Sequence, residues 1–543
     1  MNEKTKRGLE VVEAALLLGI LGDALLRATP WGLNVTLWSG ALALALLALL
    51  VRGRSKALSG EGRWLLLPLA FFSAGFAWRD SLTLQILDAL GLAVIFSLIA
   101  LRARGGWIRL AGLTEYVAGG FLAAFNGLFG AFGLLAADIQ WKEVRVNGWS
   151  RHVIAILRGV ALTVPLLFVF GALLMAADAV FEGLLKTSFQ IDFDALFSHL
   201  LLLAFLAWTS AGFLRSAVLG KELPRTKGGQ LDVSEFIQPV VYEPPTAQVE
   251  FKTLDGQSVP PPVKKKLSLG IVEIGIVLGT LNLLFLSFVI VQVRYFFGGA
   301  RLVQISAGLT YAEYARSGFF ELVWVAALVL PLLLAAHWLL RKENAAHERI
   351  FRLLAGLQVV LLFVIMTSAI GRMRLYQREY GLTELRLYTT AFMGWLALVF
   401  VWFAATVLRG RRERFACGAL VTGCAIIAAL HVLNPDDLIV RANVAHVQTV
   451  RALDVGYATS LSADAVPALV ASLPALGRIE RCRVASYLLY QRAELESADW
   501  RSWNLSRSEA ASLLRQDFGE LWEEACRSGS NGESAQSSNA DRH

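Results

Sequence analysis

A charge-dense stretch between two long apolar runs, residues 371–386, carries the side chains best suited to chemistry. It contains four arginines, two glutamates and two tyrosines in sixteen residues. Guanidinium groups form charge-assisted hydrogen bonds with carboxylates and phosphates. These arginines therefore either pair with acids from neighbouring loops or bind an anion, and both interpretations stay open.

Two further segments carry similar residue types and are expected on the same side of the membrane. One is the loop around residues 294–321, and the other is the start of the polar tail, which has the helix-start pattern Asn434-Pro435-Asp436. Together the three segments give the candidate ligand-binding residues, which are Arg294, Glu313, Arg316, Glu321, Arg372, Tyr376, Glu379, Tyr380, Asn434, Asp436 and Asn443.

Polar residues inside apolar runs form a second group of candidates: Asp88, Glu273 and Asn282. A carboxylate within a span is a functional-site candidate by default, because burying it in lipid is costly. For Glu273, an interfacial position or a helix–helix bond is an equal alternative. Asp88 is either a packing contact or a proton carrier. His431 is expected to be isolated.

Catalytic, metal and cofactor motifs are absent from the sequence. It has no His-Glu-x-x-His, no Walker loop and no Gly-x-Ser-x-Gly elbow. The four cysteines lack metal spacing and are expected to be unpaired thiols. The net charge of +8 lies in short loops rather than in a basic domain, so nucleic acid is not expected as a partner. We expect no catalytic residues, no metal and no cofactor.

The composition requires a membrane to position these residues. Of 543 residues, 56% are hydrophobic and only 17% are charged, and several apolar runs exceed 18 residues. This predicts an all-α polytopic bundle of eleven or twelve spans. The spans are expected at about 9–27, 31–51, 64–79, 82–101, 116–137, 153–177, 195–219, 268–293, 317–340, 350–371, 387–408 and 415–433. The glycine-rich segment 116–137 either crosses or is re-entrant.

Composition shifts divide the chain into six parts. They are N-terminal membrane helices (1–137), central membrane helices (138–219), a Pro/Lys-rich linker (220–267), C-terminal membrane helices (268–433), a helical tail (434–526) and a disordered end (527–543). Because basic residues are concentrated in the loops on the linker side, the linker is expected in the cytoplasm and the tail outside. The N-terminus joins the linker side if 116–137 does not cross.

The helix ends around the charge-dense stretch can also be predicted. A helix from 350 to 380 would be about 46 Å long and would project beyond a hydrocarbon core of roughly 30 Å. Gly381 suits the C′ position that ends it, and Thr383 suits the N-cap of the next helix.

Several motifs in order resemble a bacterial family of inner-membrane proteins known only as a domain of unknown function, of the 4173/4153 type. The motifs are Ala177–Phe181, Gln292–Gly299, Leu309–Glu321, residues 371–386, Asn434–Asp436 with Asn443, and Ser462–Ala468. The resemblance covers roughly residues 150–480 and implies a multi-spanning fold in a bacterial plasma membrane. It implies no activity.

Two functions stay open. The first is a carrier or accessory subunit whose outward-facing Arg/Glu/Tyr site takes an anionic ligand or a lipid headgroup. The second is a scaffold that binds a protein partner through the tail. An enzyme acting on lipid-linked substrates is a third and weaker alternative.

Overall fold

The computed structural model describes residues 2–53, 60–109, 112–141, 193–220, 270–307, 319–340, 345–447, 453–515 and 526. These residues form helices and turns without a strand, which confirms the all-α prediction. Nine of their helices are long and apolar enough to cross a membrane. The predicted span 153–177, the linker and the predicted disordered end lie outside the described residues.

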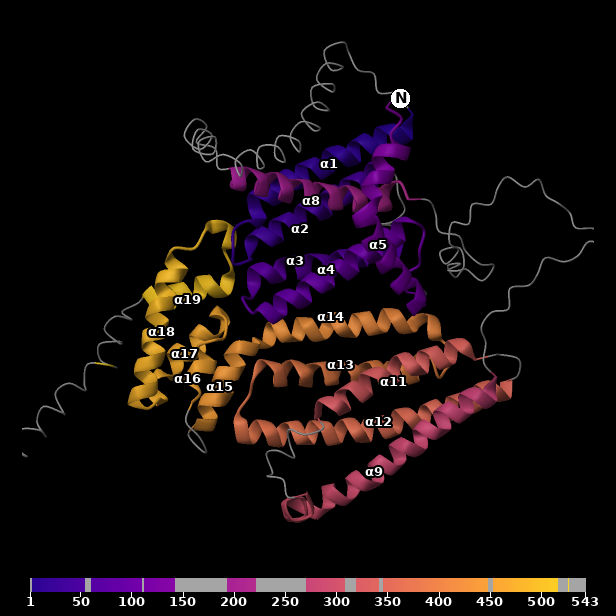
Figure 1. Ribbon diagram of the computed structural model, residues 1–543, viewed down its shortest axis with the longest axis vertical. Coiled ribbons are helices and arrows are strands. Elements are labelled where there is room, and N and C mark those ends of the chain that lie inside the picture. Colours follow the sequence, from indigo (N-terminus) through magenta and orange to yellow (C-terminus); the bar gives the residue numbers. More distant parts are fainter. Residues whose placement is uncertain are drawn as a thin grey trace, which may run out of the picture.

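The long helices form two groups, one above the other in Figure 1. The first group is α1 (Glu3–Leu26), α2 (Leu33–Arg52), α3 (Leu66–Trp78), α4 (Leu82–Ala103), α5 (Leu113–Gly133) and α8 (Phe193–Val218). The second group is α9 (Ile271–Ala307), α11 (Phe319–Leu339), α12 (Ala345–Tyr380), α13 (Glu384–Thr406) and α14 (Phe415–Leu433). Each group has its own apolar core, and Leu420, Cys424 and Ile427 of α14 also pack against the core of the first group. Eleven of the twelve predicted spans therefore correspond to helices.

Short connections make successive helices antiparallel, so the bundle has two ends. The tail end, on the left in Figure 1, gathers the connections 27–32, 79–81 and 381–383 and the start of the tail. The opposite end, here called the linker end, gathers the N-terminus, the loop 409–414 and the residues that flank the linker. The loop 409–414 and the residues that flank the linker therefore lie at the same end of the bundle (Figure 1).

The glycine-rich segment begins and ends at the linker end. The Tyr116 hydroxyl near its start donates to the Ile108 carbonyl in the connection after α4, at 2.8 Å. Asp138, in the π-helical turn that follows α5, pairs with Lys4 at 2.6 Å and with Arg215 at 2.5 Å. Both ends of the segment therefore contact residues of the linker end, although its length and composition suit a span. The described segment is one continuous helix, and both alternatives for it stay open.

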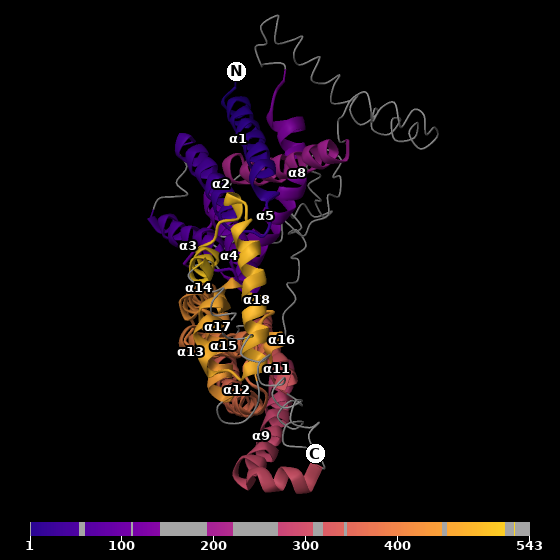
Figure 2. The same ribbon diagram turned by 90° about the vertical axis from the view of Figure 1, so that its left-hand side faces the viewer.

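The tail forms a small helical unit with its own core. Its main helices are α15 (Pro435–Val447), α16 (Val455–Ala458), α17 (Val466–Ser472), α18 (Arg478–Glu496) and α19 (Leu505–Arg515). A disulfide joins Cys482 of α18 to Cys526, so the expectation of unpaired thiols is wrong for these two residues. Figure 2 shows the tail lying across the ends of both helix groups.

Candidate functional site

The break between α12 and α13 follows the predicted pattern. Gly381 has a φ of 75°, the left-handed conformation that favours glycine at a helix C-terminus. Thr383 occupies the N-cap position of α13, although its side chain makes no capping bond. The Tyr457 hydroxyl of the tail instead accepts from the backbone N–H of Glu384 at 2.7 Å. The tail therefore caps α13 from outside.

Asn443 of α15 also fixes this break. Its Oδ1 accepts from the Leu382 N–H at 2.6 Å, and its Nδ2 donates to the Leu382 carbonyl at 2.9 Å. Asn443 was a candidate ligand-binding residue, yet both of its polar atoms are engaged with the backbone. Its observed role is to hold the chain between two membrane helices.

The structure brings together two of the predicted tyrosines and one arginine from the charge-dense stretch 371–386. The guanidinium of Arg386 lies 4.0 Å from the ring centroid of Tyr376 and 6.0 Å from that of Tyr380. The two rings are 5.0 Å apart, and Arg386 also donates to the carbonyl of Gly381. A cation over a tyrosine face is attracted by the ring quadrupole.

The last turns of α12 present exposed charges at the tail end. Arg374 and Arg378 lie one turn apart and are exposed, as is Glu379. Among the described residues no ion pair involves these three side chains, and Glu313, one of the acids of the neighbouring loops, lies outside them. Because α12 spans 36 residues, about 54 Å, these turns project beyond a hydrocarbon core.

The other residues of the predicted site differ in burial, and the structure describes only some of them. Arg372 is half-buried in α12, and Glu321 is exposed in the first turn of α11. Arg294 lies on α9, but its side chain is not described, and Glu313 and Arg316 lie outside the described residues. A single arginine–glutamate site built from all three segments is therefore not observed in the described part of the chain.

A buried carboxylate joins the tail to the first helix group. Asp464, 2% exposed, accepts from the backbone N–H groups of Asp80 at 2.7 Å and Ser81 at 3.0 Å, at the start of α4. Arg79 lies 3.2 Å from its other oxygen. A carboxylate at a helix N-terminus is stabilised by the free N–H groups and the helix dipole. Asp464 thus caps α4 across the junction.

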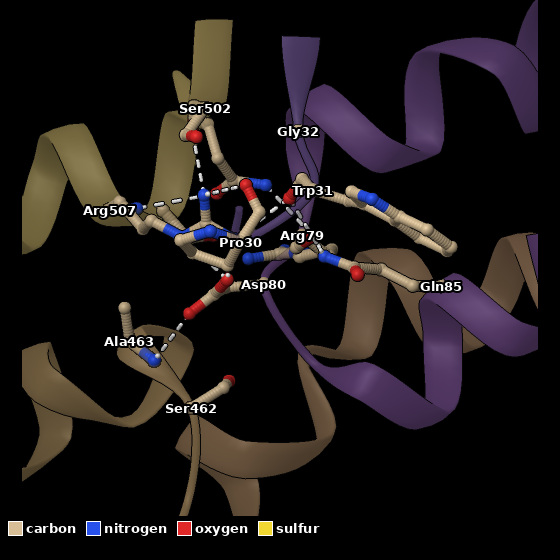
Figure 3. Close-up of polar contacts among 12 residues, drawn as sticks. Pro30, Trp31, Gly32, Arg79, Asp80, Gln85, Ser462, Ala463, Ser502 and Arg507 are labelled. Atoms are coloured by element: carbon tan, nitrogen blue, oxygen red, sulfur yellow. Dashed lines mark hydrogen bonds and ion pairs between the residues drawn. The ribbon is translucent and has the colours of Figure 1, made fainter. Parts of the chain in front are cut away.

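Arg507 of α19 is the second link in this junction. Figure 3 shows its guanidinium pointing toward Asp80, with a 2.7 Å bond from Nε to Oδ1. It also donates to the carbonyls of Ser502 at 2.6 Å and Trp31 at 2.8 Å, and it is only 7% exposed. Burial raises the pKa of Asp80, and Arg507 opposes that shift. The tail is therefore held by a buried charged network as well as by apolar packing.

Asp436 lies deep in the same junction. It is 1% exposed, and its Oδ2 accepts from the Ser462 hydroxyl at 2.5 Å. Within the described part of the chain its Oδ1 has no hydrogen-bond partner. Burial raises the pKa of Asp436 to about 6, and the charges of Glu384 and Asp464 add to the shift. The Asp436 carboxylate therefore makes its contacts inside the protein and does not face solvent.

Asn434 lies at the turn between α14 and α15. It ends α14 in a left-handed conformation with a φ of 52°, and α15 begins at Pro435 as expected. Its Nδ2 lies 3.4 Å from the Asp464 carbonyl. The amide therefore shapes the turn between membrane and tail.

The three predicted intramembrane polar residues differ in their surroundings. Glu273 is exposed in the first turn of α9, at the start of the stretch Ile271–Val291 that is long and apolar enough to span a membrane. Asn282 donates to the Leu354 carbonyl of α12 at 3.0 Å, a helix–helix bond. Asp88 pairs with His431 at 3.1 Å, so the expectation that His431 is isolated was wrong.

An apolar cavity of about 590 Å³ lies between α4 and α5, and it contains none of the candidate residues. Within the described ranges no group of three His, Cys, Asp or Glu side chains is placed to hold a metal.

Sequence reasoning missed the junction residues Asp80, Asp464 and Arg507. Asp464 falls in one of the family-like motifs, Ser462–Ala468, but nothing in the sequence pairs it with residues 384 positions earlier. Only the folded arrangement brings these residues together.

A family model matches residues 66–472, which is most of the chain. The protein belongs to the family described as Domain of unknown function (DUF4153). The DUF4153 region begins at α3, earlier than the sequence resemblance indicated, and includes Asp80, Asp88, Asp436 and Asp464. Arg507 lies beyond it. No curated protein and no solved structure matches the chain.

Proposed function

We propose that this DUF4153 protein is a multi-pass protein of a bacterial plasma membrane that binds an anionic, lipid-like ligand on its outer face. The observation that supports this most is the pair of exposed arginines, Arg374 and Arg378, on the projecting turns of α12. Arginine is disfavoured on the outer side of a membrane unless it is paired or binds an anion.

Two observations support an outward tail. Arginines and lysines are concentrated in the loops of the linker end, as in cytoplasmic loops. The disulfide between Cys482 and Cys526 is of the kind that persists in an oxidising, extracytoplasmic compartment.

The surroundings of the arginines fit a ligand with both a charged and an apolar part. Guanidinium groups bind phosphate and carboxylate through several charge-assisted bonds. Leu385, in the first turn of α13, is 63% exposed beside the Tyr376–Arg386 contact. A lipid headgroup at this level could meet the arginines while its chains stay in the bilayer.

The proposal is tested by ligand-dependent stabilisation of the full chain in detergent. Dioctanoyl phosphatidylglycerol is the anionic probe, and dioctanoyl phosphatidylcholine is the zwitterionic comparison. Each arginine near anionic lipid contributes about 1 kcal/mol, so the R374A/R378A variant should bind the anionic probe roughly 30-fold more weakly. The matched control is R478A/R483A, which removes two exposed arginines from α18 of the tail. Equal loss in both variants, or stabilisation that survives R374A/R378A, would refute the proposed site.

A scaffold function is the second candidate, and one observation favours it. On α18, Ile479 is 72% exposed and Tyr490 is 69% exposed, eleven residues apart and so on one helix face. Because the tail is part of the fold, deletion of 434–543 would disrupt the bundle as well. The sharper test is capture of a specific partner by the intact chain, which should be lost in I479S/Y490S and kept in R374A/R378A.

A further inference from the structure

Asp88 of α4 and His431 of α14 form a fully buried pair at the contact between the two helix groups. Both side chains are 0% exposed, and Oδ2 of Asp88 lies 3.1 Å from Nε2 of His431. The residues are 343 positions apart in sequence. The pair is therefore a tertiary contact that joins the first group to the second near the tail end.

The geometry fixes how many hydrogens the pair needs. Nδ1 of His431 lies 3.0 Å from the Ile427 carbonyl, and a carbonyl only accepts, so Nδ1 carries a hydrogen. The contact between Nε2 and Oδ2 needs a second hydrogen, because otherwise a nitrogen lone pair would face a carboxylate. Without that hydrogen the pair would also carry an uncompensated negative charge in a dry site. The pair thus holds one proton more than a neutral histidine beside a carboxylate.

The walls around the pair are tight and mostly apolar. A Cβ at Gly75 of α3 would lie 2.2 Å from the Asp88 carboxylate, so glycine is required there for the close approach. The rings of Phe71 and Trp78 pack against the imidazole, with centroids 5.2 and 5.6 Å away. Asp88 Oδ1 has no hydrogen-bond partner within the described ranges.

Arg79 is bonded to the backbone of His431 and links the pair to the tail. Its Nε donates to the His431 carbonyl at 2.8 Å, and its Nη1 lies 3.2 Å from Asp464. A shift of His431 would therefore be transmitted through the Arg79 side chain to Asp464, which caps α4.

We propose that Asp88 and His431 form a proton-binding site, and that the bound proton holds the two helix groups together at the tail end. When the proton is removed, the lone pair and the carboxylate repel each other and the contact between α4 and α14 weakens. This inference is independent of the ligand proposed for the outer face.

Asp88→Asn is the informative variant, because an amide can donate to Nε2 without taking up a proton. We expect the melting temperature of the full chain in detergent to fall between pH 7 and pH 10 for the wild type. For D88N the fall should be smaller, by on the order of 5 °C. Asp88→Leu should melt lower than D88N throughout, because it leaves His431 without a partner. Parallel pH profiles for wild type and D88N would overturn the proposal.

Asn282→Leu is the matched control, since it removes another buried bond between membrane helices without a titratable group. It should lower the melting temperature and leave the pH profile parallel to that of the wild type. If D88N does not fold, magnetic resonance of ¹⁵N-histidine-labelled wild type gives a second readout. A hydrogen on Nδ1 together with a proton shared between Nε2 and Asp88 supports the site, whereas a bare Nε2 beside an ionised Asp88 excludes it.

Discussion

Replacing Asp436 by asparagine should stabilise the protein at neutral pH. The carboxylate is 1% exposed, and burial raises its pKa from 3.8 to about 6. At 1.36 kcal/mol per pKa unit, this difference corresponds to roughly 3 kcal/mol of folding free energy. Asparagine keeps an oxygen that accepts from the Ser462 hydroxyl and removes the charge. The variant therefore avoids the desolvation penalty while keeping the contact.

The sign of the pH dependence follows from the raised pKa of Asp436. Folding favours its protonated form, so its contribution to stability is fully present below pH 3.8 and is lost as the pH rises through about 6. The stability gain of D436N over the wild type should be near zero at pH 4 and largest above pH 7. Melting temperatures from tryptophan fluorescence should show a gain on the order of 5 °C at pH 7.5.

Asp437 provides the control, because it is the next residue along the helix and is bonded to the exposed Arg441. Asp437→Asn removes an exposed ion pair and should change stability by less than about 1 kcal/mol. A D436N variant that melts below the wild type at pH 7.5 would refute the reasoning. So would a D436N gain that does not shrink toward pH 4.

Three further predictions concern how the tail is held. Arg507→Ala should destabilise the protein by about 3 kcal/mol or more by leaving Asp80 buried without its cation, and adding Asp80→Asn should recover part of the loss in a double-mutant cycle. Cys482→Ala opens a loop of 44 residues, which corresponds to about 4 kcal/mol in the chain-entropy model, and the unfolding midpoint of wild type in reductant should match that of the variant. Asn443→Ala removes two hydrogen bonds to the α12–α13 break and should lower the melting temperature. This fall should be smaller than the fall that R507A causes in the same assay.

Most of the helices could be predicted because a membrane span is a continuous apolar stretch of about 20 residues, which is visible in the sequence itself. The end of α12 was predicted for a local reason as well, since glycine adopts the left-handed conformation of Gly381 without a Cβ clash. The alternative that segment 116–137 does not cross was kept because basic loops flank it on both sides, and such loops are expected on the same, cytoplasmic side.

The contacts between distant segments could not be predicted, because their partners share no local pattern. Asp88 looked like a lone acid, since His431 is 343 residues away and belongs to another apolar run. The capping of α4 by Asp464 was missed for the same reason, because the helix and its cap come from opposite ends of the chain. A single sequence reports local propensity, whereas these residues are fixed by tertiary packing.

The anionic ligand proposed for this protein requires the tail to face outward, because exposed arginines on α12 are common on the cytoplasmic side and disfavoured on the outer side. The most direct measurement compares alkaline phosphatase and green fluorescent protein, each fused to His543 and each inserted in the linker 220–267. We predict active phosphatase and no fluorescence at His543, with the reverse in the linker. Fluorescence at His543 would contradict the outward tail and remove the argument for the anionic ligand.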